Sequence, residues 1–130
     1  MLETHIAYLF EELGLGSTPS FDPNGVLIFP LEGFDIHIVK QSLGVHIVSK
    51  LAPLPKKNQE TFLLRLLQAN FLGQGTGNNV LGLSDDETTL TLSLYLPEHT
   101  NLSTLKEGLE QIANYTSYWK DEITQHEAGN

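Results

Sequence analysis

The segment Leu63–Leu83 constrains the fold of this 130-residue chain more than any other part of it. Its first part is apolar at almost every helical position, and the glycine-rich run Gly73–Gly77 is typical of a helix stop and a tight return. After a short apolar run and an acidic turn, Thr89–Leu96 alternates leucine with other residues, as a half-buried strand does. The sequence therefore predicts a helix, a turn and two strands, about Val80–Leu83 and Thr89–Leu96, in direct succession.

The helix predicted to begin near Lys57 or Asn58 and to end near Leu72 is apolar around nearly its whole circumference. At about 100° per residue, only Arg65 and Gln68 mark a narrow polar side. The sheet of a small domain covers one side of such a helix, so the other side is most economically covered by the same helix of a second copy, in a twofold dimer. We expect this homodimer contact to be formed by Phe62, Leu63, Leu66, Leu67 and Asn70.

The predicted dimer contact joins four apolar side chains to one amide. Each apolar side chain would contribute roughly 1.5–3 kcal/mol before the costs of association. Asn70 falls within the apolar arc, where a buried amide needs hydrogen-bond partners and can fix the register of two helices. The alternative is a helix buried inside its own chain, with the N-terminal helix as its lid.

The first half of the chain reads as one helix and three strands. Apolar residues recur at helical spacing over residues 1–14, and Gly14 and Gly16 stop that run. Prolines and Asn24-Gly25 then mark turns. The strands are expected over Val26–Phe29, closed by Pro30, and then over Phe34–Lys40 and Gly44–Lys50.

The second and third of these strands form a hairpin whose register is indicated by its apolar face. With Gln41-Ser42 as the loop, Ile38 faces Val45 and Ile36 faces Ile47. A slip of one residue would mix the apolar and polar faces, so this pairing is favoured.

The same register places His37 opposite His46 on the other face of the hairpin, with Asp35 and Lys50 nearby. Two imidazoles could ligate a metal, but no third ligand is apparent besides Asp35, and we expect no metal site. If both histidines are charged below pH ~6.5, their repulsion should weaken the hairpin.

The last helix is expected to begin after Thr100-Asn101, once Pro97 has ended the preceding strand. Its apolar stripe consists of Leu102, Leu105, Leu109, Ile112, Thr116, Trp119 and Ile123. Residues Gln125–Asn130 are expected to form a frayed tail. The order α-β-β-β-α-β-β-α predicts an α+β fold with a twisted, largely antiparallel sheet covered by helices, in one domain over residues 1–130.

The composition excludes several classes of partner. Sixteen acidic and seven basic residues give a net charge of −9, so DNA, RNA and anionic lipid are poor ligands. No run approaches the ~20 apolar residues that span a bilayer, and the N-terminus lacks the pattern of a signal peptide. We therefore expect a cytoplasmic protein without membrane insertion.

No motif in the sequence favours catalysis or a cofactor. Gly73–Gly77 leaves a helix and enters a strand, which is the reverse of a phosphate-binding loop. Asp85-Asp86-Glu87 lacks the ligand spacing of a calcium loop, and no G-x-S-x-G elbow occurs. We expect no catalytic, metal or cofactor residues; the alternatives are a small acidic enzyme or ligand-binding domain using Gly73–Gly77, and a generic dimeric adaptor.

The run LLRLLQANFLGQGTGNNVLGL resembles a segment close to LLxANLLGxGTGxxxLGL in class I type III secretion chaperones, the CesT/SycE family. The resemblance covers roughly residues 60–120, and it extends to the first 55 residues only in pattern and element order. It implies a cytosolic homodimer, joined largely through the second helix, that binds the N-terminal segment of a secreted virulence protein (an effector) in extended form, without catalysis. Whether such a dimer also docks its cargo at the secretion ATPase stays open.

For such binding we expect two modes of recognition. Apolar effector side chains should enter grooves beside the first helix and the sheet, and an effector strand should pair with an exposed sheet edge, which we expect at Val26–Phe29. About a third of the following residues should contact effector, and the others should be core: Leu2, Ile6, Phe10, Val26, Ile28, Phe29, Ile36, Ile38, Val45 and Ile47.

Overall fold

The order of helices and strands confirms the predicted α-β-β-β-α-β-β-α succession. The computed structural model describes residues 2–31, 33–73 and 75–129. Its elements are α1 (Leu2–Glu12), β1 (Val26–Leu31), β2 (Phe34–Gln41), β3 (Gly44–Pro53), α2 (Gln59–Asn70), the 3₁₀ turn η1 (Phe71–Gly73), β4 (Val80–Leu83), β5 (Thr89–Pro97) and α3 (Leu102–Ala128). Met1 and Asn130, which were predicted to lie in the first helix and in a frayed tail, are outside the described residues.

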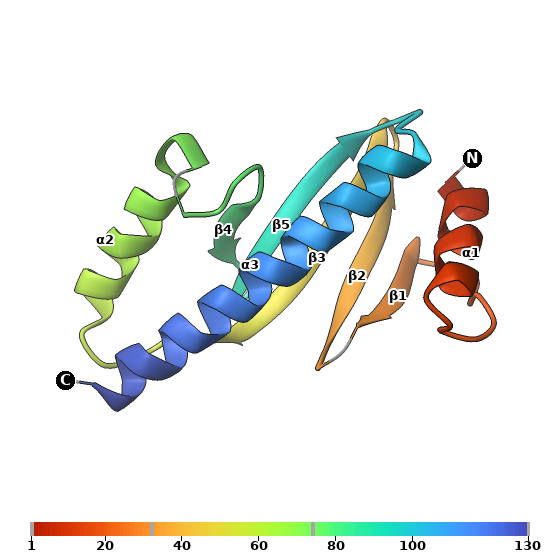
Figure 1. Ribbon diagram of the computed structural model, residues 1–130. Coiled ribbons are helices and arrows are strands. Elements are labelled where there is room, and N and C mark those ends of the chain that lie inside the picture. The colour runs from red at the N-terminus through yellow and green to blue at the C-terminus, as the bar shows by residue number, and fades with distance from the viewer. Residues whose placement is uncertain (1, 32, 74, 130) are drawn as a thin grey trace.

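The five strands form one antiparallel sheet in the order β1-β2-β3-β5-β4. Helix α3 crosses one face of this sheet, whereas α1 lies at the β1 end and α2 at the β4 end (Figure 1). The strand beginning at Val26 is therefore at an edge, as predicted. Pro30 lies inside β1 instead of ending it, because an edge strand tolerates a residue that has no N–H to give to the ladder.

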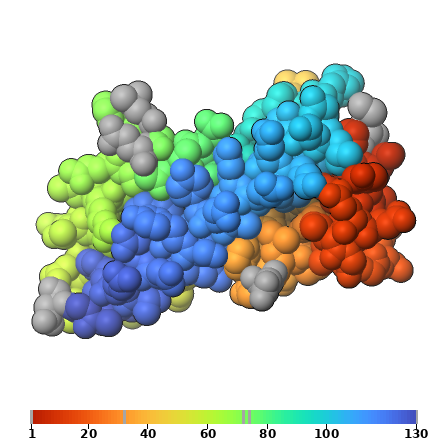
Figure 2. All heavy atoms as spheres, in the orientation of Figure 1, coloured from red at the N-terminus to blue at the C-terminus, as the bar shows by residue number. Residues whose placement is uncertain are grey.

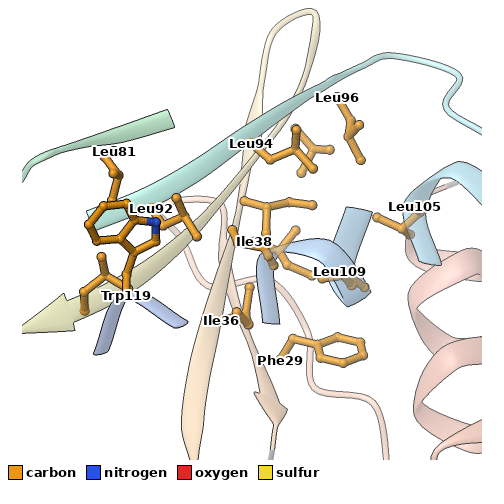
Figure 3. Close-up of a cluster of buried hydrophobic side chains, with 14 of the residues drawn as sticks. Phe29, Ile36, Ile38, Leu81, Leu92, Leu94, Leu96, Leu105, Leu109 and Trp119 are labelled. Carbon is orange, nitrogen blue, oxygen red and sulfur yellow. The ribbon is translucent and has the colours of Figure 1, made fainter. Parts of the chain in front are cut away.

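The core lies between the inner face of the sheet and α3. The predicted stripe of α3 is buried, apart from Leu102, which is half-buried. Figure 3 shows Leu105 and Leu109 of α3 directed towards Ile38 and Phe29 of the sheet. At the β1 end, the ring of Phe10 on α1 meets Phe29 edge to face at 5.1 Å and extends this core.

The predicted hairpin register is wrong by two residues. Ile38 pairs with Ile47, and the turn is Ser42-Leu43 instead of Gln41-Ser42. The turn is fixed by a strand that is distant in sequence, because the hydroxyl of Tyr95 donates to the Leu43 carbonyl at 2.8 Å. Ile36, Ile38, Val45 and Ile47 still face inwards, since a shift of two keeps every residue on its own face.

The shift separates the two histidines of the hairpin. His37 lies opposite Val48 and His46 lies opposite Val39, so the imidazoles are diagonal neighbours on the outer face. The prediction that they face each other directly is therefore wrong, and their mutual repulsion at low pH should be weaker than direct pairing implies.

The prediction of a frayed end after Gln125 is also wrong, because α3 continues to Ala128. His126 holds this last turn: its Nε2 lies 2.6 Å from the Lys57 carbonyl, and its ring packs 4.7 Å from that of Phe62. The contact joins the end of α3 to the start of α2. None of the helices in the described part of the chain is long and apolar enough to cross a membrane.

Candidate functional site: the clefts beside α1

A first cleft, the hairpin cleft, opens at the start of α1. It has a volume of about 360 Å³ and lies between α1, the β2–β3 turn and the segment that joins β5 to α3. Leu2, Val45 and Leu105 give it apolar walls, while Glu98 and His99 add polar groups. Figure 2 shows the atoms of α1 (red) beside those of this joining segment (cyan) and of the first strands (orange).

A second cleft, the loop cleft, lies along the side of α1. Its volume is about 340 Å³, and residues 18–21 of the loop before β1 form one wall. Ile6, Leu27 and Phe21 supply its apolar surface, and Glu3 and Lys40 its charged groups. Ile6 and Leu27 are core residues, so the cleft reaches down to the core of the molecule.

Lys40 lines both clefts and stands between them. Its ammonium group pairs with the carboxylate of Glu3 and lies 4.6 Å from the centre of the Phe21 ring. The hydrogen bond from Lys40 holds the pKa of Glu3 below its usual value. A second ion pair, Lys106–Glu12 at 2.7 Å, joins the other end of α1 to α3, so α1 is attached at both ends.

The lining of these clefts is better suited to binding apolar side chains than to catalysing a reaction. Each has the volume of a small binding pocket, with apolar walls and a charged rim. In the described ranges, no group of three or more His, Asp or Glu side chains could hold a metal ion. Two such clefts on one helix can hold two separate apolar groups of one extended ligand.

The structure brings only some of the predicted effector-binding residues to these clefts. Leu2 and Val45 line the hairpin cleft, and Ile6 lines the loop cleft. Val26 is half-buried, and Ile28 is 45% exposed on the edge strand. The others are buried in the core because they alternate on the inner face of the sheet or face it from α1: Phe10, Phe29, Ile36, Ile38 and Ile47.

Sequence reasoning missed Glu3, Lys40, Phe21 and Leu105 as cleft residues. The place of Lys40 at a cleft could have been recognised from its position in the strand. This lysine occupies the inward-facing phase of a strand whose other inward positions are apolar, namely Phe34, Ile36 and Ile38, and a charge at such a position indicates a boundary of the core.

The glycine-rich loop between α2 and β4 is packed against α3. The indole N–H of Trp119 donates to the Gly75 carbonyl at 2.9 Å, and a Cβ at Gly75 would lie 2.8 Å from the Cβ of Ala69. A Cβ at Gly77 would lie 3.0 Å from the ring of Tyr115. These glycines therefore allow close packing on neighbouring side chains.

The acidic turn Asp85–Glu87 uses its central carboxylate for its own hydrogen bonds. Asp86 accepts from the hydroxyl of Thr88 at 2.7 Å and from that of Ser84. These bonds lower the pKa of Asp86 to about 2. The carboxylate thus stabilises the β4–β5 turn.

Residues 4–120 match the model of the Tir chaperone protein (CesT) family. The chain belongs to the CesT family. No curated protein sequence matches it significantly.

Solved structures share the fold of this CesT-family chain at low sequence identity. The HopA1–SchA chaperone–effector complex has 16% identity and a TM-score of 0.73, over 92% of this chain and 93% of the other. The ExoU–SpcU complex from the type III secretion system of Pseudomonas aeruginosa has 21% identity and a TM-score of 0.73, over 93% of this chain and 96% of the other. The ExsC–ExsE complex has 12% identity and a TM-score of 0.76, over 92% of this chain and 91% of the other.

The second helix of this CesT-family chain is only partly covered by its own chain. Phe62 and Leu66 are buried and Leu63 is half-buried, so of the predicted dimer residues Leu67, 68% exposed, is the most accessible. The surface of this end of the molecule also carries Leu64, Phe71, Val80 and Leu83. The alternative in which α1 is the lid of α2 is wrong, because these helices lie at opposite ends of the sheet (Figure 1).

Proposed function

We propose that this CesT-family protein is a cytosolic type III secretion chaperone without catalytic activity. It binds the N-terminal segment of one or more effectors in extended form and keeps that segment soluble and competent for secretion. The observation that carries the proposal is the family match over residues 4–120, together with two apolar clefts on either side of Lys40. The rival proposal of an enzyme that uses Gly73–Gly77 loses support because Gly75 and Gly77 are packed against neighbouring side chains.

An extended segment suits the geometry of the clefts. One apolar side chain of the segment enters the hairpin cleft and another enters the loop cleft, while its backbone passes the Lys40–Glu3 ion pair. Binding orders a disordered segment, and this ordering costs conformational entropy. The cost offsets part of the large interaction free energy, so that binding stays reversible.

The functional unit we propose is a homodimer of single-domain chains, joined at the α2 and β4 end. Leu64, Leu67 and Phe71 are more than half exposed there, as is Val80 on β4. Exposed apolar side chains that gather at one end of a molecule are typical of a protein–protein contact. Because α1 lies at the far end of the sheet, dimerisation leaves the clefts of each chain open.

Pull-down from the source organism tests the proposed function. The tagged protein should recover one or a few secreted proteins, identified by mass spectrometry, and Leu2→Glu should lose them because it places a charge in the hairpin cleft. Leu13→Glu, at a residue that is half exposed and outside both clefts, is the matched control and should retain them. Recovery that is equal in both variants, or saturable stabilisation by a small molecule alone, would contradict the proposal.

A further inference from the structure

The segment 16–21, which leads from α1 towards β1, forms one wall of the loop cleft without any hydrogen bond of its own. Residues 18–21 line the cleft. Within the described part of the chain, no backbone or side-chain group of this segment makes a hydrogen bond. A displacement of the segment therefore breaks no hydrogen bond of the protein, and such parts of a fold move at low cost.

Both ends of this segment are fixed. The N–H of Leu15 donates to the Phe10 carbonyl at 2.9 Å, and Gly14, left-handed at φ +66°, ends α1 in a Schellman motif. At the other end, the N–H of Asp22 donates to the Val26 carbonyl at 2.9 Å, and its Oδ1 accepts from the Val26 N–H at 2.9 Å. Movement is thus confined to the segment between these bonds.

Phe21 is the one side chain of the segment that is not exposed. Residues 16–20 are exposed, whereas Phe21 is half-buried and packs against the core. Its ring lies 4.6 Å from the Nζ of Lys40, which is paired with Glu3. The negative face of an aromatic ring attracts an ammonium group. The contact between Phe21 and Lys40 therefore holds the segment against the body of the protein.

The loop cleft beside Phe21 has room for another aromatic ring. An apolar cavity of about 150 Å³ can hold benzene, and this cleft measures about 340 Å³. Ile6 and Leu27 offer such a ring an apolar surface, and Lys40 offers it a cation. Because the ammonium is already in contact with Glu3 and with Phe21, an entering ring reaches it by taking the place of Phe21.

We propose that residues 16–21 are a flap whose Phe21 is an internal occupant of the loop cleft, and that an aromatic side chain of the extended partner displaces Phe21 from Lys40. The proposal rests on the proposed function, which supplies the partner. An aromatic ring replaces the contact with the ammonium that Phe21 gives up, whereas an aliphatic side chain of the same size does not. The loop cleft therefore selects an aromatic residue.

Chymotrypsin cleavage after Phe21 in the full free chain measures how often the flap is open, because a protease cleaves the opened form. Lys40→Met keeps the aliphatic stem and removes the charge, so cleavage should be about threefold faster. Lys50→Met, at an exposed lysine of β3 outside both clefts, is the matched control and should be cleaved at the wild-type rate.

A further variant separates the flap from the attachment of α1. Glu3→Gln removes the ion pair and leaves the ammonium, so its cleavage rate should stay closer to that of wild type than the rate of Lys40→Met does. Equal acceleration in Glu3→Gln and Lys40→Met would assign the effect to α1 and overturn the proposal, as would a wild-type rate in Lys40→Met.

Random 12-residue peptides displayed on phage and selected on the wild-type chain test the displacement by its sign. As an occupant, Phe21 competes with the peptide, so Phe21→Ala should bind the selected peptides at least about threefold more tightly. As a mere wall, Phe21 would lend contact area, and Phe21→Ala would bind more weakly. Tyr8→Ala, at an aromatic residue of α1 that is 54% exposed and outside both clefts, is the control and should bind as wild type does.

Synthetic copies of the selected peptides test the aromatic preference. Exchange of their aromatic residue for cyclohexylalanine, which has a similar size and no aromatic face, should weaken binding to the wild-type chain about fivefold and binding to Lys40→Met much less. The photoreactive 4-benzoylphenylalanine at the same place should cross-link to residues that line the loop cleft. Equal binding of both peptides by wild type, or cross-links only elsewhere, would refute the proposal.

The possible failures are distinguishable. Weaker binding by Phe21→Ala refutes displacement and leaves the proposed function intact, because an extended peptide is still bound. The comparison with cyclohexylalanine on the wild-type chain decides the question even where Phe21→Ala does not fold. Failure to select any peptide on the wild-type chain would contradict the proposed function itself, and the flap proposal with it.

Discussion

The side-chain amide of Asn70 bonds both backbone groups of Leu81, donating to the carbonyl at 2.9 Å and accepting from the N–H at 2.8 Å. The sequence indicated that this amide needs partners, and the structure finds them within the same chain. The end of α2 is thereby joined to β4, so that the exposed apolar residues of both elements lie at one end of the molecule.

Loss of this bridge should destabilise the fold. Asn70→Ala leaves the N–H and carbonyl of Leu81 without their partner, which should lower the free energy of unfolding by about 1–3 kcal/mol. Denaturant unfolding measures this change. Asn78→Ala, at an exposed asparagine of the neighbouring loop, is the control and should change stability by less than about 0.5 kcal/mol; equal effects would show that the bridge contributes nothing.

A methyl group should be tolerated at Gly82 of β4 and not at Gly75 of the glycine-rich loop. Gly75→Ala places its Cβ 2.8 Å from that of Ala69, and the repacking should cost about 1–3 kcal/mol. In Gly82→Ala the nearest atom is the Thr91 hydroxyl at 3.8 Å, so stability should fall much less. Thermal unfolding of both variants gives the comparison, and a stable Gly75→Ala chain would contradict the packing described for the loop.

Acid should loosen the attachment of α1. The pKa of Glu3 is lowered in the fold by Lys40, so the ion pair stabilises the fold above the usual carboxyl pKa of 4.5, and this contribution is lost as pH falls through the folded value. Amide exchange in α1 should therefore be slower in wild type than in Glu3→Gln at pH 7, and the two should converge below pH 4.5. A difference that is independent of pH would rule out the charge as its cause.

A charge on the exposed side of α2 should prevent dimerisation. Leu67 is 68% exposed in the single chain, so Leu67→Asp should leave the fold intact and give monomers in light scattering. Leu43→Asp, at a residue 71% exposed in the β2–β3 turn, is the control and should stay dimeric. If Leu67→Asp stays dimeric as well, α2 is not the interface.

Local patterns predicted the elements and the faces that they bury. The 3-4 spacing in α3 and the alternation in the strands each identify a buried side, because burial and periodicity are directly linked. The register of the β2–β3 hairpin could not be predicted in this way, since it depends on Tyr95, which lies 52 residues from Leu43.

Prediction of the site was limited for a similar reason. The alternation in β2 shows that Ile36, Ile38 and Lys40 share one face of the sheet. It does not show how far α1 extends over that face. Leu2 at the start of α1 and Ile28 on the edge strand β1 keep accessible surface, and such margins are set by the packing of whole elements.

Native mass spectrometry of the protein co-purified with its partner, after limited proteolysis, distinguishes a dimer that holds a polypeptide from a single chain. We predict a protected particle of two 14.4 kDa chains and one N-terminal effector fragment. A single chain that retains no polypeptide fragment would contradict it.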